Sequence, residues 1–260
     1  AKESGVEYWR DAMFSGELIN KTESRAVLHT ALRQPTSVGS NFPSGSSDKQ
    51  THAELQRVKK FSQKLRENKL KGYADNNFTD IVCIGVGGSN LGPELVTEAL
   101  TATKAHATFK LHFISSVDAL PLTSLLAKLN PATTLFIVSS KTFTTSETML
   151  NAHTAKRWML ETLPEEAVAK HFVAVTVDPI KAAKFGIDSS FCFRIWEWVG
   201  GRFSFWSAMG LPIAIKFGFE VFEELLAGAH EMDCHFKTAD ISDNMPILMA
   251  LVGIWNSTFL

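Results

Sequence analysis

Short apolar runs alternate with helically spaced apolar residues through the middle of the chain. Runs rich in β-branched and aromatic residues predict strands at 81–84, 109–115, 135–138, 172–177 and 191–195. The spacing of apolar residues between these runs predicts helices at 95–102, 120–129 and 147–163. Strands that alternate with helices are typical of a parallel sheet covered on both faces. The pattern therefore predicts an α/β fold with a three-layer, doubly wound, mostly parallel sheet and flanking helices.

The segments on either side of this alternation are predicted to be helical. Helical spacing runs through 6–33, where Gly16 interrupts it, and again through 53–70. A dense cluster of Pro, Gly, Ser and Asn at 34–48 predicts an exposed loop between the two helical stretches. Later in the chain, an amphipathic stripe at 221–236 predicts a helix that packs on the core.

The last residues predict an apolar helix, which begins at Pro246 and reaches Leu260 without a stop signal. Ile254, Trp255 and Phe259 would leave its end hydrophobic and exposed. We therefore expect the chain to be truncated. The apolar stretch is also too short to span a bilayer.

A glycine-rich stretch follows the first predicted strand. It reads IGVGGSNLGP at 84–93, with four glycines within eight positions before a predicted helix start. Glycines let a ligand approach the backbone, and the unpaired N–H groups of a helix start attract an anion. We interpret the stretch as a phosphate-binding turn, but an ordinary tight connection with Ser89 as a helix cap explains it equally well. Asn90 stands where the dinucleotide fingerprint has its third glycine, and no P-loop lysine follows.

A loop rich in hydroxyl groups follows the third predicted strand. It reads SSKTFTTSET at 139–148, and seven of the nine residues from Ser139 to Glu147 are Ser, Thr or Lys. Hydroxyls donate to phosphate oxygens and an ammonium attracts them, so the loop predicts a second phosphate-binding segment. Parallel sheets bind ligands at this edge. The alternative is a solvated loop with Ser146 as a helix cap and Lys141 in water.

A third stretch, WVGGRFS at 198–204, places Arg202 after two glycines and between aromatic residues. Its guanidinium could face an anion or a developing oxyanion. Pairing with a carboxylate in a structural network is the alternative.

These three motifs, together with INKTESRAVLHTALR at 19–33, resemble the ordered motifs of the phosphoglucose isomerase family. The resemblance extends over nearly the whole chain. Asn90 stands where the family pattern has Asp, Ser146 where it has Gln, and Phe203 where Tyr is common. None of these changes removes a phosphate ligand that the resemblance implies.

The resemblance implies a flavodoxin-like sugar-isomerase (SIS) domain and a fixed division of the chain. We expect an amino-terminal helical segment and linker at 1–70, the first SIS domain at 71–236, and the start of a connection to a second SIS domain at 237–260. The implied reaction is the reversible conversion of glucose 6-phosphate to fructose 6-phosphate through an enediolate, without a cofactor or a metal. Family members form homodimers whose active sites are completed across subunits.

Residue roles follow from the same resemblance. Arg202 is similar to the arginine that stabilises the enediolate, and the residues implied to hold the substrate, chiefly its phosphate, are Gly88, Ser89, Ser140, Lys141, Thr142 and Thr145. The glutamate base, and the histidine and lysine that open the sugar ring, belong to motifs that this sequence lacks. Glu147 belongs to the phosphate loop and is not assigned as the base. We therefore expect this chain to bind sugar phosphate weakly without turnover.

Composition excludes several other classes of protein. The chain has 260 residues and 45% hydrophobic content, enough for a sizeable core. Twenty-six Lys and Arg against 27 Asp and Glu leave a net charge of −1, which does not suggest nucleic acid or a membrane surface as a partner. Cys83, Cys192 and Cys234 lack metal-site spacing and are predicted to be buried thiols in a reducing cytosol. No signal peptide is visible, so we expect a cytoplasmic protein.

The histidines are predicted to be structural. His29 has no second ligand type at helical spacing, and His153 and His171 are expected to face solvent or to cap elements.

Two other functions remain open at this point. A non-catalytic module that senses sugar phosphates would use the same fold and the same loops. A dinucleotide-dependent oxidoreductase is disfavoured, because Asn90 breaks the fingerprint and the hydroxyl-rich loop has no role in it.

Overall fold

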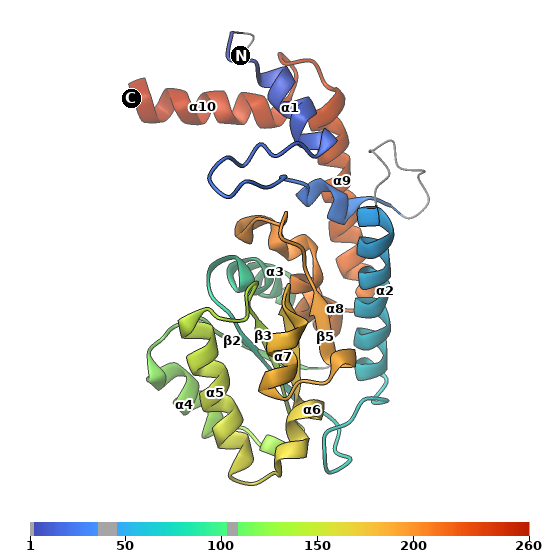
Figure 1. Ribbon diagram of the computed structural model, residues 1–260, viewed down its shortest axis with the longest axis vertical. Coiled ribbons are helices and arrows are strands. Elements are labelled where there is room, and N and C mark those ends of the chain that lie inside the picture. Colours follow the sequence, from blue (N-terminus) through green and yellow to red (C-terminus); the bar gives the residue numbers. More distant parts are fainter. Residues whose placement is uncertain (1–2, 36–45, 103–108, 260) are drawn as a thin grey trace.

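The structure is a computed structural model that describes residues 3–35, 46–102 and 109–259. At its centre lies a parallel sheet with the strand order β2-β1-β3-β4-β5 (Figure 1). The strands are β1 (Asp80–Ile84), β2 (Lys110–Ile114), β3 (Thr134–Ser139), β4 (Phe172–Thr176) and β5 (Cys192–Arg194). The predicted parallel, doubly wound α/β sheet is confirmed.

Side chains of successive strand residues point to opposite faces of the sheet, where they enter two separate cores. On β1, Ile81 and Cys83 belong to one core, and Val82 and Ile84 belong to the other. Both faces of the strands are therefore buried. This double burial explains why the strands read as continuous apolar runs instead of alternating ones.

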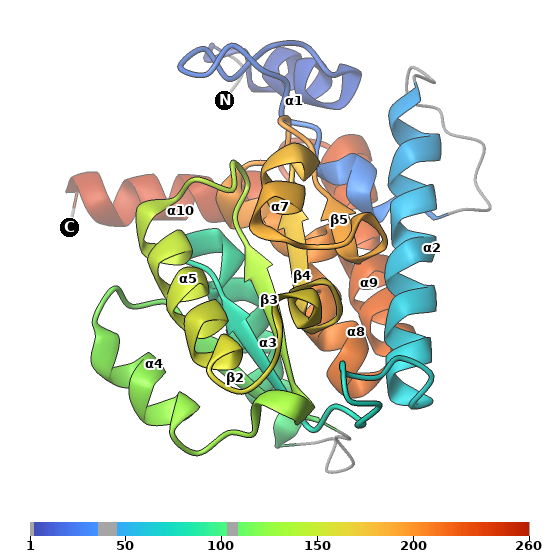
Figure 2. The ribbon, with the colours of Figure 1, turned by 60° about the horizontal axis from the view of Figure 1, so that its bottom comes forward.

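Helices cover both faces (Figures 1 and 2). The core that contains Ile81 is covered by α2 (Ser46–Arg66), α3 (Leu91–Thr101), α8 (Leu211–Phe217) and α9 (Phe219–Thr238). The core that contains Val82 is covered by α4 (Ala119–Leu126), α5 (Ser146–Leu160), α6 (Val168–His171) and α7 (Pro179–Phe185). This arrangement is the three-layer architecture that the sequence predicted.

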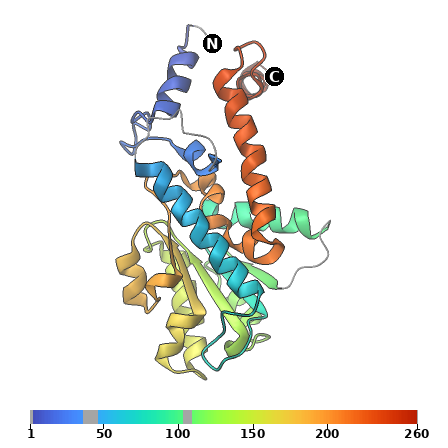
Figure 3. The ribbon, with the colours of Figure 1, turned by 90° about the vertical axis from the view of Figure 1, so that its right-hand side faces the viewer.

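Two terminal helices lie at the far end of α9, away from the sheet (Figure 3). They are α1 (Val6–Ser15) and α10 (Met245–Phe259), and Phe14 of α1 packs against Phe236 of α9 with ring centroids 5.9 Å apart. The predicted apolar helix near the end of the sequence is confirmed. Ile247 is buried, but the apolar end of the helix is exposed as expected, with Ile254 57%, Trp255 58% and Phe259 66% accessible. No helix among the described residues is long and apolar enough to cross a membrane.

The helical prediction for 6–33 is wrong in its middle. Gly16 ends α1 with a left-handed φ of 81°, and its amide donates to the carbonyls of the last helical turn. The chain then forms an irregular loop, closed by an antiparallel bridge between Asn20 and Arg25, before a short 3₁₀ helix at His29–Arg33. The interruption predicted at Gly16 is therefore a helix end, and the residues that follow it are not helical until the 3₁₀ turn at His29–Arg33.

The loop predicted at 34–48 lies mostly outside the described residues. Its last three positions belong to α2, which begins at Ser46, earlier than the apolar spacing from position 53 indicated. Within α2, Val58, Phe61 and Leu65 are buried in the core that contains Ile81.

Two predictions about single residues are also wrong. His171 is completely buried: its Nδ1 donates to the Thr134 carbonyl and its Nε2 accepts from the Tyr73 amide, both at 2.8 Å. His171 therefore links the Tyr73 amide to the Thr134 carbonyl. Nothing in the sequence indicates that these two backbone groups need a side-chain partner. Cys234 is exposed on α9, whereas Cys83 and Cys192 are buried as predicted.

We predict that His171→Leu lowers the free energy of unfolding at pH 7 by about 1–3 kcal/mol, because the buried Thr134 carbonyl and the partly buried Tyr73 amide lose their partner. It should also flatten the acid dependence of stability. Burial lowers the pKa of His171 below its usual 6.5, so the unfolded chain binds a proton first as the pH falls below that value. Wild-type stability therefore falls from about pH 6.5 downward.

Urea unfolding at pH 7.5 and pH 5.5 measures both effects. The control is His153→Leu on α5, an exposed histidine whose ring lies 5.0 Å from that of Phe185; leucine keeps an apolar contact there, so neither quantity should change. An unchanged pH slope in His171→Leu would contradict the assignment.

Candidate phosphate-binding and active site

The two predicted phosphate loops lie next to each other at the carboxyl edge of the sheet. The glycine-rich turn follows β1 and the hydroxyl-rich loop follows β3, and these strands are paired to their ends, with Ile84 opposite Val138. From β1 the chain continues to β2 on one side of this pair, and from β3 it continues to β4 on the other. The border between β1 and β3 is therefore a topological switch point, where open parallel sheets bind ligands.

The helices that start at this edge differ in how their first amides are satisfied. Asp118 caps α4 and Asp178 caps α7, each carboxylate accepting from a first-turn amide. At α3 and α5 the N-cap residues are Asn90 and Thr145, and neither side chain makes a cap hydrogen bond. The uncapped helix starts after β1 and β3 leave N–H groups and positive dipole ends available to an anion.

The alternative roles as helix caps are not observed. Ser89 precedes the N-cap of α3, and Ser146 is the first residue of α5 instead of its cap.

The hydroxyls after β3 are paired with one another. Ser140 Oγ lies 3.1 Å from Thr145 Oγ1, and Thr142 Oγ1 lies 2.7 Å from Thr144 Oγ1. Phe143 holds the loop in shape, because its ring is buried although its φ is 52°. The loop therefore presents several donors from a fixed backbone.

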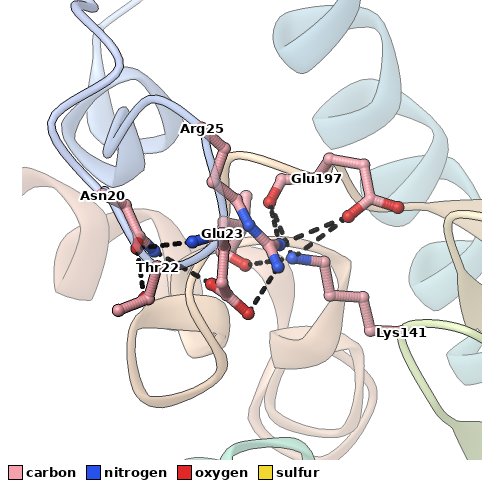
Figure 4. Close-up of polar contacts among 7 residues, drawn as sticks. Asn20, Thr22, Glu23, Arg25, Lys141 and Glu197 are labelled. Carbon is pink, nitrogen blue, oxygen red and sulfur yellow. Dashed lines mark hydrogen bonds and ion pairs between the residues drawn. The ribbon is translucent and has the colours of Figure 1, made fainter.

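Lys141 is not in water, which was the alternative for this loop. Its ammonium donates to the carbonyls of Glu197 at 2.7 Å and Val199 at 2.9 Å, and it lies 3.5 Å from the Glu197 carboxylate (Figure 4). Burial, and then the charge of Arg25, lower the pKa of Lys141. The hydroxyl-rich loop is thus tied to the segment that leads to Arg202.

The segment at 19–33 reaches the same place. Arg25 donates to the Glu197 carbonyl at 2.6 Å and lies 3.3 Å from its carboxylate, while Glu23 pairs with the other side of the guanidinium at 2.5 Å (Figure 4). Asn20 in turn donates to Glu23 at 2.9 Å. Sequence reasoning assigned no role to Glu23, Arg25 or Glu197. Their only signal was that each lies within or beside a recognised motif.

The glycine-rich turn contacts the Arg202 segment directly. A Cβ on Gly88 would overlap the carbonyl of Gly201 and come within 2.9 Å of the Arg202 amide nitrogen. Ser204 adds a hydrogen bond, donated by its hydroxyl to the Gly88 carbonyl at 3.2 Å. Gly88 is therefore required for close packing of two backbone segments, and it places Arg202 beside the turn.

Arg202 is exposed and has no carboxylate partner in the described part of the chain, so the structural-network alternative is not observed. Its guanidinium lies 5.2 Å from the centre of the Phe203 ring. It borders a cavity of about 520 Å³ that is also lined by Thr22, Glu23 and Trp198. The Arg202 guanidinium thus places a permanent positive charge at the border of this cavity.

His29 packs under this segment. Its ring stacks on Phe203 with centroids 4.3 Å apart. Burial, and then the charge of Arg33, lower the pKa of His29 to about 4. The ring is uncharged at neutral pH and packs as an aromatic side chain, in agreement with the structural role predicted for it.

All four sequence motifs therefore meet at one edge of the sheet. The whole chain, residues 1–260, matches the sequence model of a family described as phosphoglucose isomerase. The chain belongs to the phosphoglucose isomerase family.

Relatives named as isomerases support this assignment. The chain is 48% identical to a glucose-6-phosphate isomerase from Pseudoalteromonas translucida, over 100% of this chain and 47% of that protein. A crystal structure of a glucose-6-phosphate isomerase from Chlamydia trachomatis superposes with a TM-score of 0.82 at 29% identity, over 98% of this chain and 48% of that one. The chain thus spans about half the length of these relatives.

A third relative is a solved hypothetical protein, TT0462, from Thermus thermophilus. It matches with a TM-score of 0.59 at 28% identity, over 77% of this chain and 47% of that one.

The structure gives a physical reason for Asn90, at the position where the resemblance led us to expect Asp. Asn90 is buried and donates to the Glu94 carboxylate at 2.6 Å. An ionised Asp there would face Glu94 as a like charge one helical turn away. The amide avoids this repulsion, and the turn keeps its shape.

We predict that Gly88→Ala destabilises the protein by about 1–3 kcal/mol and displaces the Arg202 segment, because the new methyl group meets the Gly201 carbonyl. Urea unfolding gives the first quantity, and amide exchange at 200–204 gives the second. Gly228→Ala on α9 is the matched control: its added methyl meets no atom within 4 Å, so it should be neutral or stabilising. Equal behaviour of the two variants would contradict the close contact.

Proposed function

We propose that the chain forms the phosphate-binding part of a glucose-6-phosphate isomerase. The observation that carries this proposal is the meeting of four motifs where β1 and β3 end, beside two helix starts without side-chain caps. Such an edge suits a small phosphorylated ligand. Membership of the phosphoglucose isomerase family supports glucose 6-phosphate and fructose 6-phosphate as the ligands.

The proposed phosphate ligands come from both loops. Gly88 and Ser89 supply the turn before α3, and Ser140, Thr142 and Thr145 supply hydroxyls before α5, with the charge of Lys141 close by. Binding energy from the phosphate then holds the reacting end of the sugar in place. The remaining step is a proton transfer between neighbouring carbons, which leaves substrate and product at the same oxidation level and calls for no cofactor or metal.

Arg202 is proposed to stabilise the enediolate. Its charge is permanent, and its place beside an open cavity lets it meet an oxyanion that forms on the sugar. The base that removes the proton, and the groups that open the ring, are proposed to come from outside these 260 residues. Glu147 is no substitute in this proposal, because it lies exposed in the first turn of α5.

Three further assignments are part of the proposal. The chain divides into an amino-terminal segment (1–70), a first SIS domain (71–236) and a connection (237–260). The complete isomerase is a homodimer with shared active sites. Its location is the cytoplasm, where its sugar phosphates are metabolised.

The isolated chain is expected to bind inorganic phosphate and glucose 6-phosphate, but not glucose. Calorimetry or amide chemical shifts measure this binding. Thr142→Val should weaken phosphate binding by about 10-fold, because a hydrogen bond to an anion is lost. Thr162→Val, just beyond the opposite end of α5, is the matched control and should bind as wild type does. Equal affinity of glucose and glucose 6-phosphate would refute the phosphate site.

The same purified chain is expected to show no isomerase turnover, because the base is absent. The measurement is a coupled assay at high protein concentration, with each purification fraction tested. Activity that follows the chain through purification would show that a base lies within these residues.

A further inference from the structure

The segment before Arg202 is held by two cations that belong to distant parts of the chain. Arg25 and Lys141 both donate to the carbonyl of Glu197, at 2.6 Å and 2.7 Å, and Lys141 also donates to that of Val199 at 2.9 Å (Figure 4). Two like charges at one acceptor repel each other. The carboxylates of Glu23 and Glu197 offset this repulsion.

This geometry commits the Lys141 ammonium to the protein. A lysine has three donors. Two of them point to carbonyls, and the nearest further acceptor is the Glu197 carboxylate at 3.5 Å. A direct bond from Lys141 to a phosphate would have to use this third donor, in competition with the Glu197 carboxylate.

The anchored carbonyls lie directly before two consecutive glycines. Gly200 and Gly201 follow Val199, and glycines give the backbone more freedom than any other residue. On the far side of Arg202, the Ser204 hydroxyl donates to the carbonyls of Gly201 at 2.7 Å and Gly88 at 3.2 Å. The position of Arg202 is thus fixed from both sides, and the Lys141 contacts supply one of the two fixed points.

We propose that Lys141, assisted by Arg25, is a positioning residue that holds the Arg202 segment in its catalytic place, instead of a direct ligand of the substrate phosphate. Its two carbonyl bonds couple the phosphate loop to the arginine. Of the tests below, the kinetic test rests on the proposed isomerase function. The hydrogen-exchange test does not.

The first test measures order in the isolated chain. The amides of Val199 and Phe203 donate within the segment, at 3.0 Å each, and report on its shape. Lys141→Gln should raise their hydrogen exchange rates by about 10-fold or more. Lys184→Gln makes the same charge change at an exposed site on α7 and should leave both rates unchanged. Unchanged exchange in Lys141→Gln would overturn the proposal.

The second test measures binding of inorganic phosphate to the same proteins. A positioning role predicts that Lys141→Gln changes the affinity by less than about 3-fold, whereas loss of a charged ligand costs about 10-fold or more. A loss of that size, with Lys184→Gln unaffected, would overturn the proposal.

The third test is a kinetic cycle in the complete isomerase. Lys141→Gln should lower kcat by about 10- to 100-fold with little change in KM, because a misplaced arginine stabilises the transition state less. In a protein that already carries Arg202→Gln, adding Lys141→Gln should lower kcat little further. A rise in KM with kcat unchanged, or losses that multiply in the double variant, would overturn the proposal.

The outcomes distinguish the proposed isomerase function from the proposed role of Lys141. An inactive complete wild-type protein would refute the proposed function, and the exchange rates would still decide whether Lys141 holds the segment. A normal isomerase with unchanged exchange would refute the positioning role alone.

Discussion

The close approach of two backbone segments, at Gly88 and Gly201, is the constraint on which the candidate site depends. A side chain at Gly88 would overlap the Gly201 carbonyl, so the turn after β1 and the segment that carries Arg202 lie in direct contact. Because a buried central strand fixes the turn, the position of Arg202 depends on the sheet. The hydroxyl-rich loop joins the same assembly through Lys141. A single backbone contact thus links a packed core to a charged group at its surface.

The carboxyl edge of the sheet serves two different purposes along its length. After β2 and β4, aspartates satisfy the first amides of the helices, and those loops are complete within themselves. After β1 and β3, the corresponding side chains turn to other partners: Asn90 donates to Glu94, and Thr145 pairs with Ser140. Helix starts in the centre of the sheet therefore keep unused hydrogen-bonding capacity. At the N-cap position itself, the protein places a carboxylate at the flanks and an uncharged side chain at the centre, where the acidic residues Glu94 and Glu147 lie within the first helical turn instead. An anion therefore finds an open cap position after β1 and β3.

Sequence patterns predicted the layers, the strands and the edge at which the motifs lie, because burial on both faces and βα alternation leave local signatures. They could not predict the contacts that organise the site. Arg25 and Glu197 are 172 positions apart, and nothing local indicates that a backbone carbonyl will accept from a distant guanidinium. The same limit explains the misplaced His171, whose partners are backbone groups of other segments. Gly16 was recognised as an interruption of the helical spacing, but apolar residues beyond it still indicated a helix where the chain forms an irregular loop.

The buried ring of Phe143 has a consequence for the energetics of ligand capture. Its left-handed φ of 52° is a conformation that costs a non-glycine residue about 1–3 kcal/mol, and contacts with the core, including the ring of Phe185 at 6.1 Å, offset that cost during folding. The loop is therefore preorganised: the entropy of ordering it is lost before any anion arrives. Affinity for a small anion at this edge is then coupled to the rigidity of the core beneath it, and changes in the packing around Phe185 would alter binding without touching a ligand.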